Sequence, residues 1–225
     1  MSVHGDIWNV APWPDGWTVR HVAETGSTNA DLLADLAAGL VGDRSVLVTD
    51  HQTAGRGRLD RRWDAPPGTN LLVSIALAPV PSVAADATHR VGLAALSAVR
   101  DVRPDAQVAL KWPNDLLVDD RKLAGILAQR SSTRDAVVVG LGLNVSWAPD
   151  GAARLGSSVR PADVLTRLLR HFDELADPIG PRDRSELSTS GERVRGELPA
   201  GPAGEGPAVD VDESGRLGVR GADGV

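Results

Sequence analysis

The sequence predicts an α+β protein with one main domain and a smaller β-rich module. Up to residue 176, apolar or alternating runs of strand length are interleaved with longer segments of helical periodicity. Residues 177–190 lose this pattern and contain Pro178 and Pro181 among several serines, which is typical of a linker. Short strand-like pieces separated by glycine and proline follow. We therefore expect the main domain at 1–176, the linker at 177–190 and a small barrel-like module at 191–225.

Strand patterns occur throughout the main domain. The first alternates between apolar and polar residues, and the later ones are apolar runs bounded by turn residues. We expect strands at residues 18–24, 45–50, 70–78, 107–112 and 136–147. Before the last of these, LLVDDRKLAGILAQ has the pattern of a hairpin that turns at Asp119 and Asp120. Gly140 and Gly142 interrupt the last strand, and such glycines usually mark a bulge or a ligand lying against the backbone.

Three segments have helical periodicity. The first follows the capping hydroxyls of Ser27 and Thr28 and is stopped by Gly39 and Gly42. Its apolar face would carry Leu32, Leu33, Leu36, Ala37 and Leu40. The second helix is alanine-rich and is expected from a cap at Ser82 to about Asp101, with His89 as an ordinary surface or packing residue, and the third covers residues 161–175.

Composition excludes several classes of function. The chain has no cysteine, which excludes disulfides, thiolate catalysis and cysteine metal sites. A net charge of -6 argues against the broad basic face of a nucleic-acid-binding domain. The first residues lack a signal-peptide pattern, and no apolar run reaches membrane length. We expect a cytoplasmic protein whose partners include neither DNA nor a membrane.

A glycine- and arginine-rich loop follows the second predicted strand. In HQTAGRGRLDRRW (51–63), Gly55 and Gly57 let the backbone approach an anion closely. The arginines of the loop supply forked donors that suit carboxylate or phosphate, and they are Arg56, Arg58, Arg61 and Arg62. The alternative is a solvated basic turn, because charge runs usually lie on surfaces. The other motifs favour an anion site.

Lysine usage singles out one short segment. Of 24 basic residues only two are lysines, Lys111 and Lys122, so the other 22 are arginines. Where arginine is the usual choice, a retained lysine suggests that a compact, proton-tunable ammonium is needed. Between the two lysines, Pro113 cannot donate to a sheet ladder, so WPND should bend and project Asn114 and Asp115 out of the sheet.

Several familiar sites are missing from the sequence. It contains no GxxxxGK[ST], GxSxG or HExxH motif, and Gly140-Leu141-Gly142 lacks the third glycine of a dinucleotide fingerprint. What remains is an anion-binding loop, a polar bend, Lys122 and a strand interrupted by two glycines. These parts suit nucleotide activation of a carboxylate, in which positive groups offset the charge that develops on a transferring phosphoryl group.

Four motifs, in this order, resemble those of biotin protein ligases: GRGRLDRRW (55–63), KWPNDLLV (111–118), RKLAGIL (121–127) and GLGLNV (140–145). The resemblance covers about residues 18–147. It implies a mixed β-sheet flanked by helices, related to class II aminoacyl-tRNA synthetases and lipoate ligases, with a small SH3-like β module at the C-terminus. It also implies two reactions. Biotin and ATP would form biotinyl-5'-adenylate, and a lysine of the biotin carboxyl carrier domain of an acyl-CoA carboxylase would then take the biotin.

The resemblance also implies roles for individual residues. Lys122, Arg58 and Asp115 would be catalytic, with Lys122 touching the biotin carboxylate and the phosphate. Asp115 would help to position magnesium or the incoming lysine, or alternatively would cap the bend. Contacts to biotin or its adenylate would come from Ser27, Thr28, Asn29, Gln52, Gly55, Arg56, Gly57, Arg58, Arg61, Trp63, Lys111, Asn114, Lys122, Gly125, Gly142 and Asn144. Trp63 would cover the adenine. ATP with Mg²⁺ would be a co-substrate and biotin a substrate, with no permanently bound cofactor.

Two features depart from the family pattern. Members that also act as repressors carry an N-terminal helix-turn-helix, whereas some twenty residues precede the first strand here, so we expect a monofunctional ligase. The C-terminal module looks incomplete, because Gly196 and Gly218 fall in strand interiors and its last strand is not evident. A lipoate or octanoyl ligase and a catalytically impaired biotin-binding module are the alternative functions. The sequence leaves open whether the protein is a monomer or a weak dimer.

Overall fold

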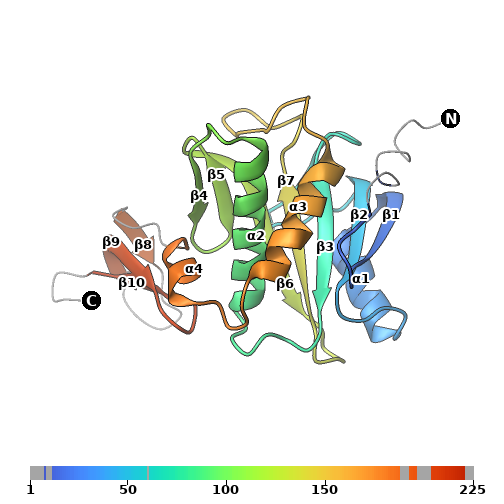
Figure 1. Ribbon diagram of the computed structural model, residues 1–225, viewed down its shortest axis with the longest axis horizontal. Helices are drawn as coiled ribbons and strands as arrows, with labels where there is room; N and C mark the ends of the chain where they lie inside the picture. Colours follow the sequence, from blue (N-terminus) through green and yellow to red (C-terminus); the bar gives the residue numbers. More distant parts are fainter. Residues whose placement is uncertain (1–7, 9–11, 60, 188–192, 197–203, 221–225) are drawn as a thin grey trace.

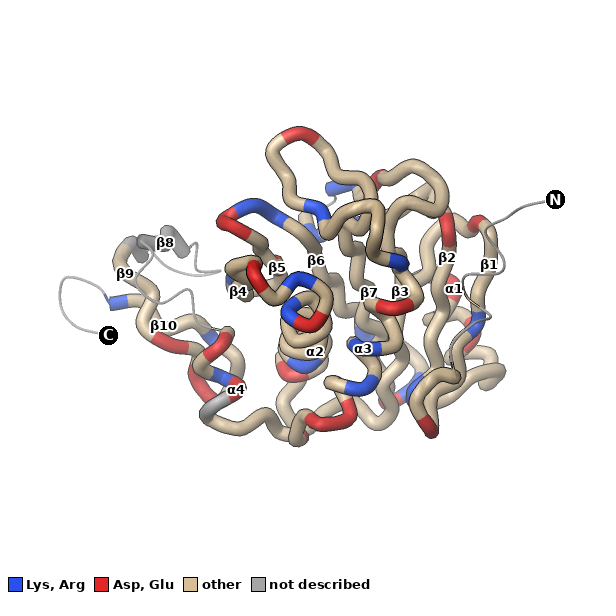
Figure 2. Tube along the Cα trace, turned by 45° about the horizontal axis from the view of Figure 1, so that its top comes forward, with Lys and Arg blue, Asp and Glu red and all other residues tan. Residues whose placement is uncertain are grey.

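The computed structural model of the 225-residue chain describes residues 8, 12–59, 61–187, 193–196 and 204–220. A central sheet with helices on both faces forms the main domain, and a three-stranded module lies at its side (Figure 1). Acidic and basic positions are distributed along the whole described trace, as Figure 2 shows. None of the described helices combines the length and apolarity that a membrane span requires.

The central sheet has seven strands in the order β1-β2-β3-β7-β6-β5-β4. The strands are β1 (Thr18–Thr25), β2 (Ser45–Gln52), β3 (Leu71–Leu77), β4 (Val108–Lys111), β5 (Asp115–Val118), β6 (Arg121–Arg130) and β7 (Val137–Leu143). β1 and β2 run parallel, and every other neighbouring pair is antiparallel. The sheet is therefore mixed, as the resemblance implied.

Helices cover the two faces of the sheet unequally. On one face lies α1 (Thr28–Ala37), which contacts β2, β3 and β7. On the other face α2 (Asp86–Val102) and α3 (Pro161–Glu174) pack against each other and the sheet, and Figure 1 shows them crossing in front of it. The larger hydrophobic core lies beneath α2 and α3, and a smaller cluster of Leu32, Leu36, Leu47, Ala76, Ala136 and Val138 lies beneath α1.

Two helix boundaries differ from the prediction. α1 ends at Ala37, and Gly39 takes the left-handed conformation that stops it, so Leu40 leaves the apolar face and is 74% exposed. α2 begins at Asp86 instead of Ser82. Its start is set by a tertiary contact, because the buried Asp86 carboxylate accepts the backbone N–H of Ile179 at 3.0 Å.

The predicted hairpin between β5 and β6 is confirmed. Asp119 and Asp120 both have positive φ, 49° and 59°, which is the backbone of a type I′ turn. The ladder beyond the turn contains a bulge, because Leu117 pairs with Lys122 but Leu116 pairs with Ala124. Leu123 is the extra residue, and the side chains that follow it change face.

The C-terminal module contains β8 (Arg193–Gly196), β9 (Gly204–Val211) and β10 (Leu217–Val219), paired antiparallel in the order β10-β9-β8. The predicted linker is more structured than expected. It contains α4 (Pro181–Ser185), and Ile179 and Leu187 are buried in the core because the segment packs against the main domain. Residues 221–225, where a further strand would continue, lie outside the described part of the chain.

Candidate active site

The glycine–arginine loop connects β2 to β3 and folds back on itself. The backbone N–H of Trp63 donates to the Gly55 carbonyl at 3.0 Å, and that of Gly57 donates to the Arg61 carbonyl at 2.7 Å. Arg56 and Arg62 form an isolated antiparallel bridge. A Cβ on Gly55 would lie 2.4 Å from the Trp63 carbonyl, so only glycine fits there. The arginine side chains remain exposed, as an anion site needs.

One arginine ties the loop to the bend between β4 and β5. Arg58 donates from Nη1 to Asn114 Oδ1 at 3.2 Å. Asn114 is held in turn by Ile126, whose carbonyl accepts from Asn114 Nδ2 at 2.9 Å and whose N–H donates to the Asn114 carbonyl at 2.9 Å. The bend therefore positions a guanidinium at the edge of the sheet.

The next residue of the bend pairs with a lysine on β6. Lys122 Nζ lies 2.7 Å from Asp115 Oδ1, with 41% and 27% of the two side chains exposed. An ion pair this open contributes at most about 1 kcal/mol to stability, so its main effect is orientation. The bulge at Leu123 makes it possible, because it brings Lys122 to the face that carries Asp115 and Gly125.

Two glycines form the floor beside this pair. Gly125 on β6 pairs directly with Gly142 on β7, and the indole of Trp63 lies against both. A Cβ on Gly142 would be 2.4 Å from Trp63 Cε2, and one on Gly125 would be 3.3 Å from Trp63 Cζ3. Lys122 Nζ is 6.0 Å from the centre of the indole ring. Trp63 Nε1 is buried and has no hydrogen-bond partner among the described residues.

A buried polar network lies at the other end of the same face, where α1 begins. Gln52 Oε1 accepts from the backbone N–H of Thr28 at 2.9 Å and lies 3.0 Å from Thr28 Oγ1. Ser74 Oγ, which is fully buried on β3, lies 2.7 Å from Thr28 Oγ1 and 2.6 Å from Asn29 Oδ1. This network satisfies part of the helix N-terminus and joins α1 to β2 and β3.

Asn29 is fixed from both sides. Its Nδ2 donates to the Leu127 carbonyl at 3.1 Å and to Gln129 Oε1 at 2.8 Å, which turns Oδ1 toward Ser74. A Cβ on Gly140 would lie 2.4 Å from that oxygen, so the first glycine of β7 makes room for Asn29. β7 is paired regularly on both sides, so its glycines mark close approach of side chains and not a bulge.

The structure brings most of the predicted residues onto this one face. Thr28, Asn29 and Gln52 form its polar end, while the loop, Asn114, Asp115, Lys122 and the two floor glycines form the other. Ser27 sits at the N-cap of α1 with no side-chain cap bond, although capping was expected. The side chain of Arg61 is exposed on the loop.

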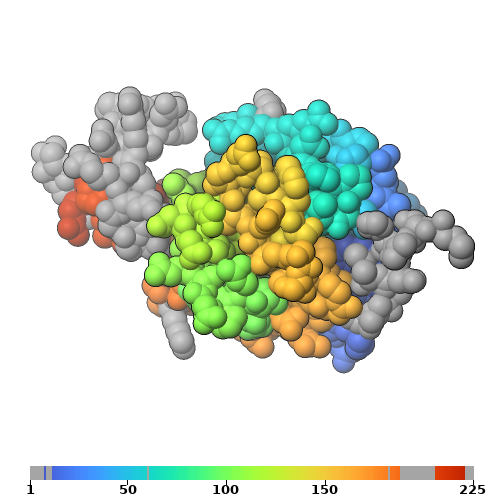
Figure 3. All heavy atoms as spheres, turned by 90° about the horizontal axis from the view of Figure 1, so that it is seen from above, coloured from blue at the N-terminus to red at the C-terminus, as the bar shows by residue number. Residues whose placement is uncertain are grey.

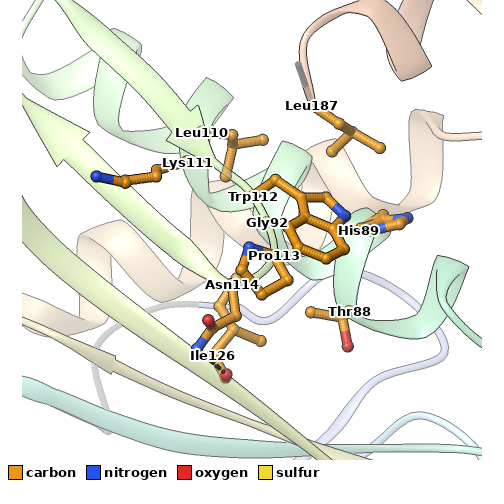
Figure 4. Close-up of a pocket in the computed structure, with 10 residues that line it drawn as sticks. All are labelled: Thr88, His89, Gly92, Leu110, Lys111, Trp112, Pro113, Asn114, Ile126 and Leu187. Carbon is orange, nitrogen blue, oxygen red and sulfur yellow. Dashed lines mark hydrogen bonds between the residues drawn. The ribbon is translucent and has the colours of Figure 1, made fainter. Parts of the chain in front are cut away.

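Lys111, the last residue of β4, pairs directly with Asp115 and therefore lies on the same face, where it is exposed, and Figure 4 shows its side chain directed away from Trp112. Asn144 lies apart from this group. Asn144 is buried, donates from Nδ2 to the Ala153 carbonyl at 3.0 Å and accepts from Asn70 Nδ2 at 3.2 Å. These bonds give Asn144 a structural role that ties β7 to the segment following it. That segment also bonds the loop before β3, since Ser146 donates to the Thr69 carbonyl, and Figure 3 shows the two segments (gold and cyan) side by side.

The sequence interpretation missed Ser74 and Gln129. Ser74 is the one polar residue in LLVSIAL (71–77), and a hydroxyl in an otherwise apolar central strand requires a buried partner. That signal was available in the sequence. Gln129 had none, because it lies near the exposed end of β6. For a metal, the described residues contain no group of three His, Cys, Asp or Glu side chains that could hold one.

Comparisons with known proteins converge on one family. Residues 23–145 match the model of the biotin/lipoate A/B protein ligase family, and residues 189–225 match that of the biotin protein ligase C terminal domain. A biotin acetyl-CoA-carboxylase ligase of Mycobacterium tuberculosis is 42% identical over 224 residues, covering 90% of this chain and 83% of its own. One from Paracoccus denitrificans is 37% identical over 183 residues, covering 76% and 74%.

Solved structures agree with these sequence matches. The biotin protein ligase from Aquifex aeolicus in complex with biotin and ATP superimposes with a TM-score of 0.77 at 25% identity, covering 92% of this chain and 93% of the other. The enzyme from Leishmania major in complex with biotin has a TM-score of 0.63 at 25% identity, covering 92% and 96%.

The fit between Gly140 and Asn29 predicts a specific cost. In Gly140→Ala the new methyl would lie 2.4 Å from Asn29 Oδ1, and Asn29 is buried and held by hydrogen bonds on both sides, so it cannot yield easily. We expect the free energy of unfolding in urea to fall by about 1–3 kcal/mol. Gly42→Ala is the control, because a Cβ there meets nothing within 4 Å, and its effect should stay within about 0.5 kcal/mol. Equal losses in the two variants would contradict this packing argument.

Proposed function

The chain belongs to the biotin/lipoate A/B protein ligase family, and from that premise we propose that it is a biotin protein ligase. The biotin carboxylate attacks the α-phosphate of ATP, which gives biotinyl-5'-adenylate and releases pyrophosphate. The ε-amine of a lysine then attacks the acyl carbon, forms an amide and releases AMP. The acceptor we propose is the biotin carboxyl carrier domain of an acyl-CoA carboxylase, and the place of reaction is the cytoplasm.

The observation that carries the choice of biotin is a proton count in the network at α1. Thr28 N–H must donate, so the Gln52 atom beside it is the amide oxygen, Oε1. Asn29 Nδ2 donates to two other groups, so Asn29 presents Oδ1 to Ser74, and the Ser74 hydroxyl must donate to it. The Thr28 hydroxyl then has one proton for two neighbours, Ser74 Oγ at 2.7 Å and Gln52 Oε1 at 3.0 Å.

Three oxygen–oxygen contacts therefore share two hydroxyl protons, so one of the three is not a hydrogen bond. Gln52 Oε1 already accepts from the Thr28 N–H, and when the Thr28 hydroxyl donates to Ser74 this oxygen keeps a second lone pair open to a donor from a ligand. The ureido ring of biotin carries two N–H donors, whereas the dithiolane of lipoate and the chain of octanoate carry none. The count supports biotin over the lipoate or octanoyl alternative.

The opposite end of the face suits the reaction centre. A carboxylate and a triphosphate repel each other, and cations placed between them lower that repulsion. We assign this role to Lys122, oriented by Asp115, and to Arg58, oriented by Asn114. Mg²⁺ would arrive with the ATP phosphates, which usually provide most of its non-water ligands, and Asp115 is the site carboxylate suited to meet it. We further assign Gly125 and Gly142 to the floor on which the ligand lies, so that Trp63 shifts when the ligand enters.

Exchange of radiolabelled pyrophosphate into ATP tests the proposal. Exchange should require biotin and should not be supported by lipoate or octanoate, and thermal stabilisation should follow the same order because only a ligand that binds the native state stabilises it. A protein that is stabilised by biotin but never catalyses exchange would be a binding module. Adenylate formation without transfer to any biotin carboxyl carrier domain would refute the proposed acceptor.

Lys122→Arg should lower the rate of adenylate formation by about ten- to a hundredfold. The substitution keeps the charge but replaces a compact ammonium with a planar guanidinium, which cannot keep the same contact with Asp115 Oδ1 and an anionic ligand at once. Lys111→Arg is the comparison, since Lys111 is the other lysine of the chain and pairs with Asp115 in the β4–β5 ladder, while the ion pair with the Asp115 carboxylate is made by Lys122. Near-wild-type single-turnover rates for both variants would show that the lysine at 122 has no special role.

Arg58→Gly should form the adenylate and lose it to solvent. A mixed anhydride must be shielded from water and stray amines, so the loop has to close over it, and one charge-assisted contact is worth about ten- to a hundredfold in retention. Release is measured as labelling of bystander lysines, and formation is measured separately in a single turnover. If Arg58 instead serves ATP binding, the variant will make no adenylate. Normal formation with normal retention would contradict both roles.

A further inference from the structure

The turn between β9 and β10 meets the main domain, next to Val211 and Leu217, which pack into the main hydrophobic core. Its shape is fixed by Asp212, whose Oδ1 accepts from Ser214 N–H at 2.8 Å, Ser214 Oγ at 2.7 Å and Arg216 N–H at 2.9 Å. The hydrogen bonds from Ser214 and Arg216 lower the pKa of the Asp212 carboxyl. Gly215 forms the tip of the turn with φ +80°. The tip is therefore a rigid, glycine-only structure.

Gly215 fits closely against the start of α2. A Cβ on Gly215 would lie 2.3 Å from Ala85 Cβ and 2.9 Å from His89 Cε1. His89 is buried there, which fits the packing role of the two that were expected, and burial lowers the pKa of its imidazole despite the nearby Asp86. At neutral pH the turn therefore meets an uncharged ring.

The same glycine holds the tryptophan of the catalytic bend. The Gly215 carbonyl accepts from Trp112 Nε1 at 3.2 Å. Figure 4 shows the Trp112 indole lying among His89, Pro113 and Leu187, around a small hollow that Leu110 and Ile126 also line. The module thus contacts the back of the bend, while Asn114 and Asp115 serve the ligand face two and three residues further on.

A second contact secures the turn. Arg184, on α4, donates from Nη1 to the Asp212 carbonyl at 2.9 Å and from Nη2 to the Ile179 carbonyl at 3.0 Å. Ile179 is itself bonded to the buried Asp86 at the start of α2. The turn is therefore clamped between the linker and the main domain, and its tip has little freedom beside Trp112.

We propose that Gly215 and Trp112 are positioning residues for adenylation: the module, through this turn, sets the bend that orients Arg58 and Lys122. The inference rests on the proposed function for what the bend catalyses. The structural part of the inference does not depend on that function. It states that loss of the Gly215–Trp112 contact loosens residues 112–118. Biotin binding should be little affected, because Thr28, Gln52 and Ser74 lie on α1, β2 and β3, away from β4 and β5.

The test compares Trp112→Phe and Gly215→Ala with matched controls in the full chain. Trp112→Phe removes the indole N–H and keeps an aromatic ring, and its control is Trp17→Phe, which loses a bond from Nε1 to Asp173 Oδ2 at 3.0 Å far from the bend. Gly215→Ala has Gly151→Ala as control, because Gly151 has the similar φ of +79° but a Cβ there meets nothing within 4 Å.

We expect kcat for biotin-dependent pyrophosphate exchange to fall about five- to twentyfold in both test variants, with the biotin dissociation constant within about twofold of wild type. Amide hydrogens of residues 112–118 should exchange faster in both and remain unchanged in the controls. Since both substitutions remove one contact, the double variant should be no slower than the slower single variant.

Unchanged kcat and unchanged exchange at 112–118 in Trp112→Phe would overturn the proposal, and so would equal losses in the controls. If Gly215→Ala detaches the whole module from the main domain, Trp112→Phe still decides the question. Normal amide protection of residues 206–219 in Trp112→Phe would show that the module remains folded there. A wild-type protein without biotin-dependent exchange would refute the proposed function, while the amide measurement would still report whether the module sets the bend.

Discussion

Both ends of the site depend on three glycines of the sheet, which have no side chain and so leave room for a neighbouring residue. Gly140 leaves room for Asn29, and Gly125 with Gly142 leaves room for Trp63. Because Gly125 and Gly142 are direct partners in the β6–β7 ladder and Asp115 pairs with Gly125, the floor and the Lys122–Asp115 pair form one row across three strands. Glycine inside a strand costs roughly 0.5–1 kcal/mol. These strands are internal to the sheet and packed by α2 on the opposite face, which offsets that cost.

An irregularity in the ladder is equally necessary. In a regular strand, side chains alternate between faces, so residues three apart, such as Lys122 and Gly125, would point in opposite directions. The bulge at Leu123 removes that conflict and leaves Leu123 and Ala124 both buried. The ammonium therefore lies above the floor, next to the carboxylate that orients it. A single departure from strand geometry thus connects the bend between β4 and β5 with the glycine floor.

The sequence predicted the fold well wherever local pattern and tertiary structure agree. Alternation and apolar runs located the seven strands of the main sheet. Asp119 and Asp120 predicted the type I′ turn between β5 and β6. Leu40 and Ser82 were misplaced, because Gly39 ended one helix early and the buried contact of Asp86 set the start of the other. The motifs located the residues that form the face of the site but not the contacts that position them. Neither the bulge at Leu123 nor the contact of Gly215 with Trp112 has a local signature, since each depends on residues brought together only by folding.

The unequal covering of the sheet has a consequence for access. α1 covers β2, β3 and β7, whereas over Gly125 and Gly142 the covering layer is a loop that contributes one indole and one arginine contact. A helix packed there would have to give up an apolar stripe to move away, at a cost comparable to partial unfolding. The loop buries one ring there and makes one arginine contact, so displacing it would cost less. Such a displacement would leave the hydrophobic core closed, and a bound molecule would take the place of the displaced indole.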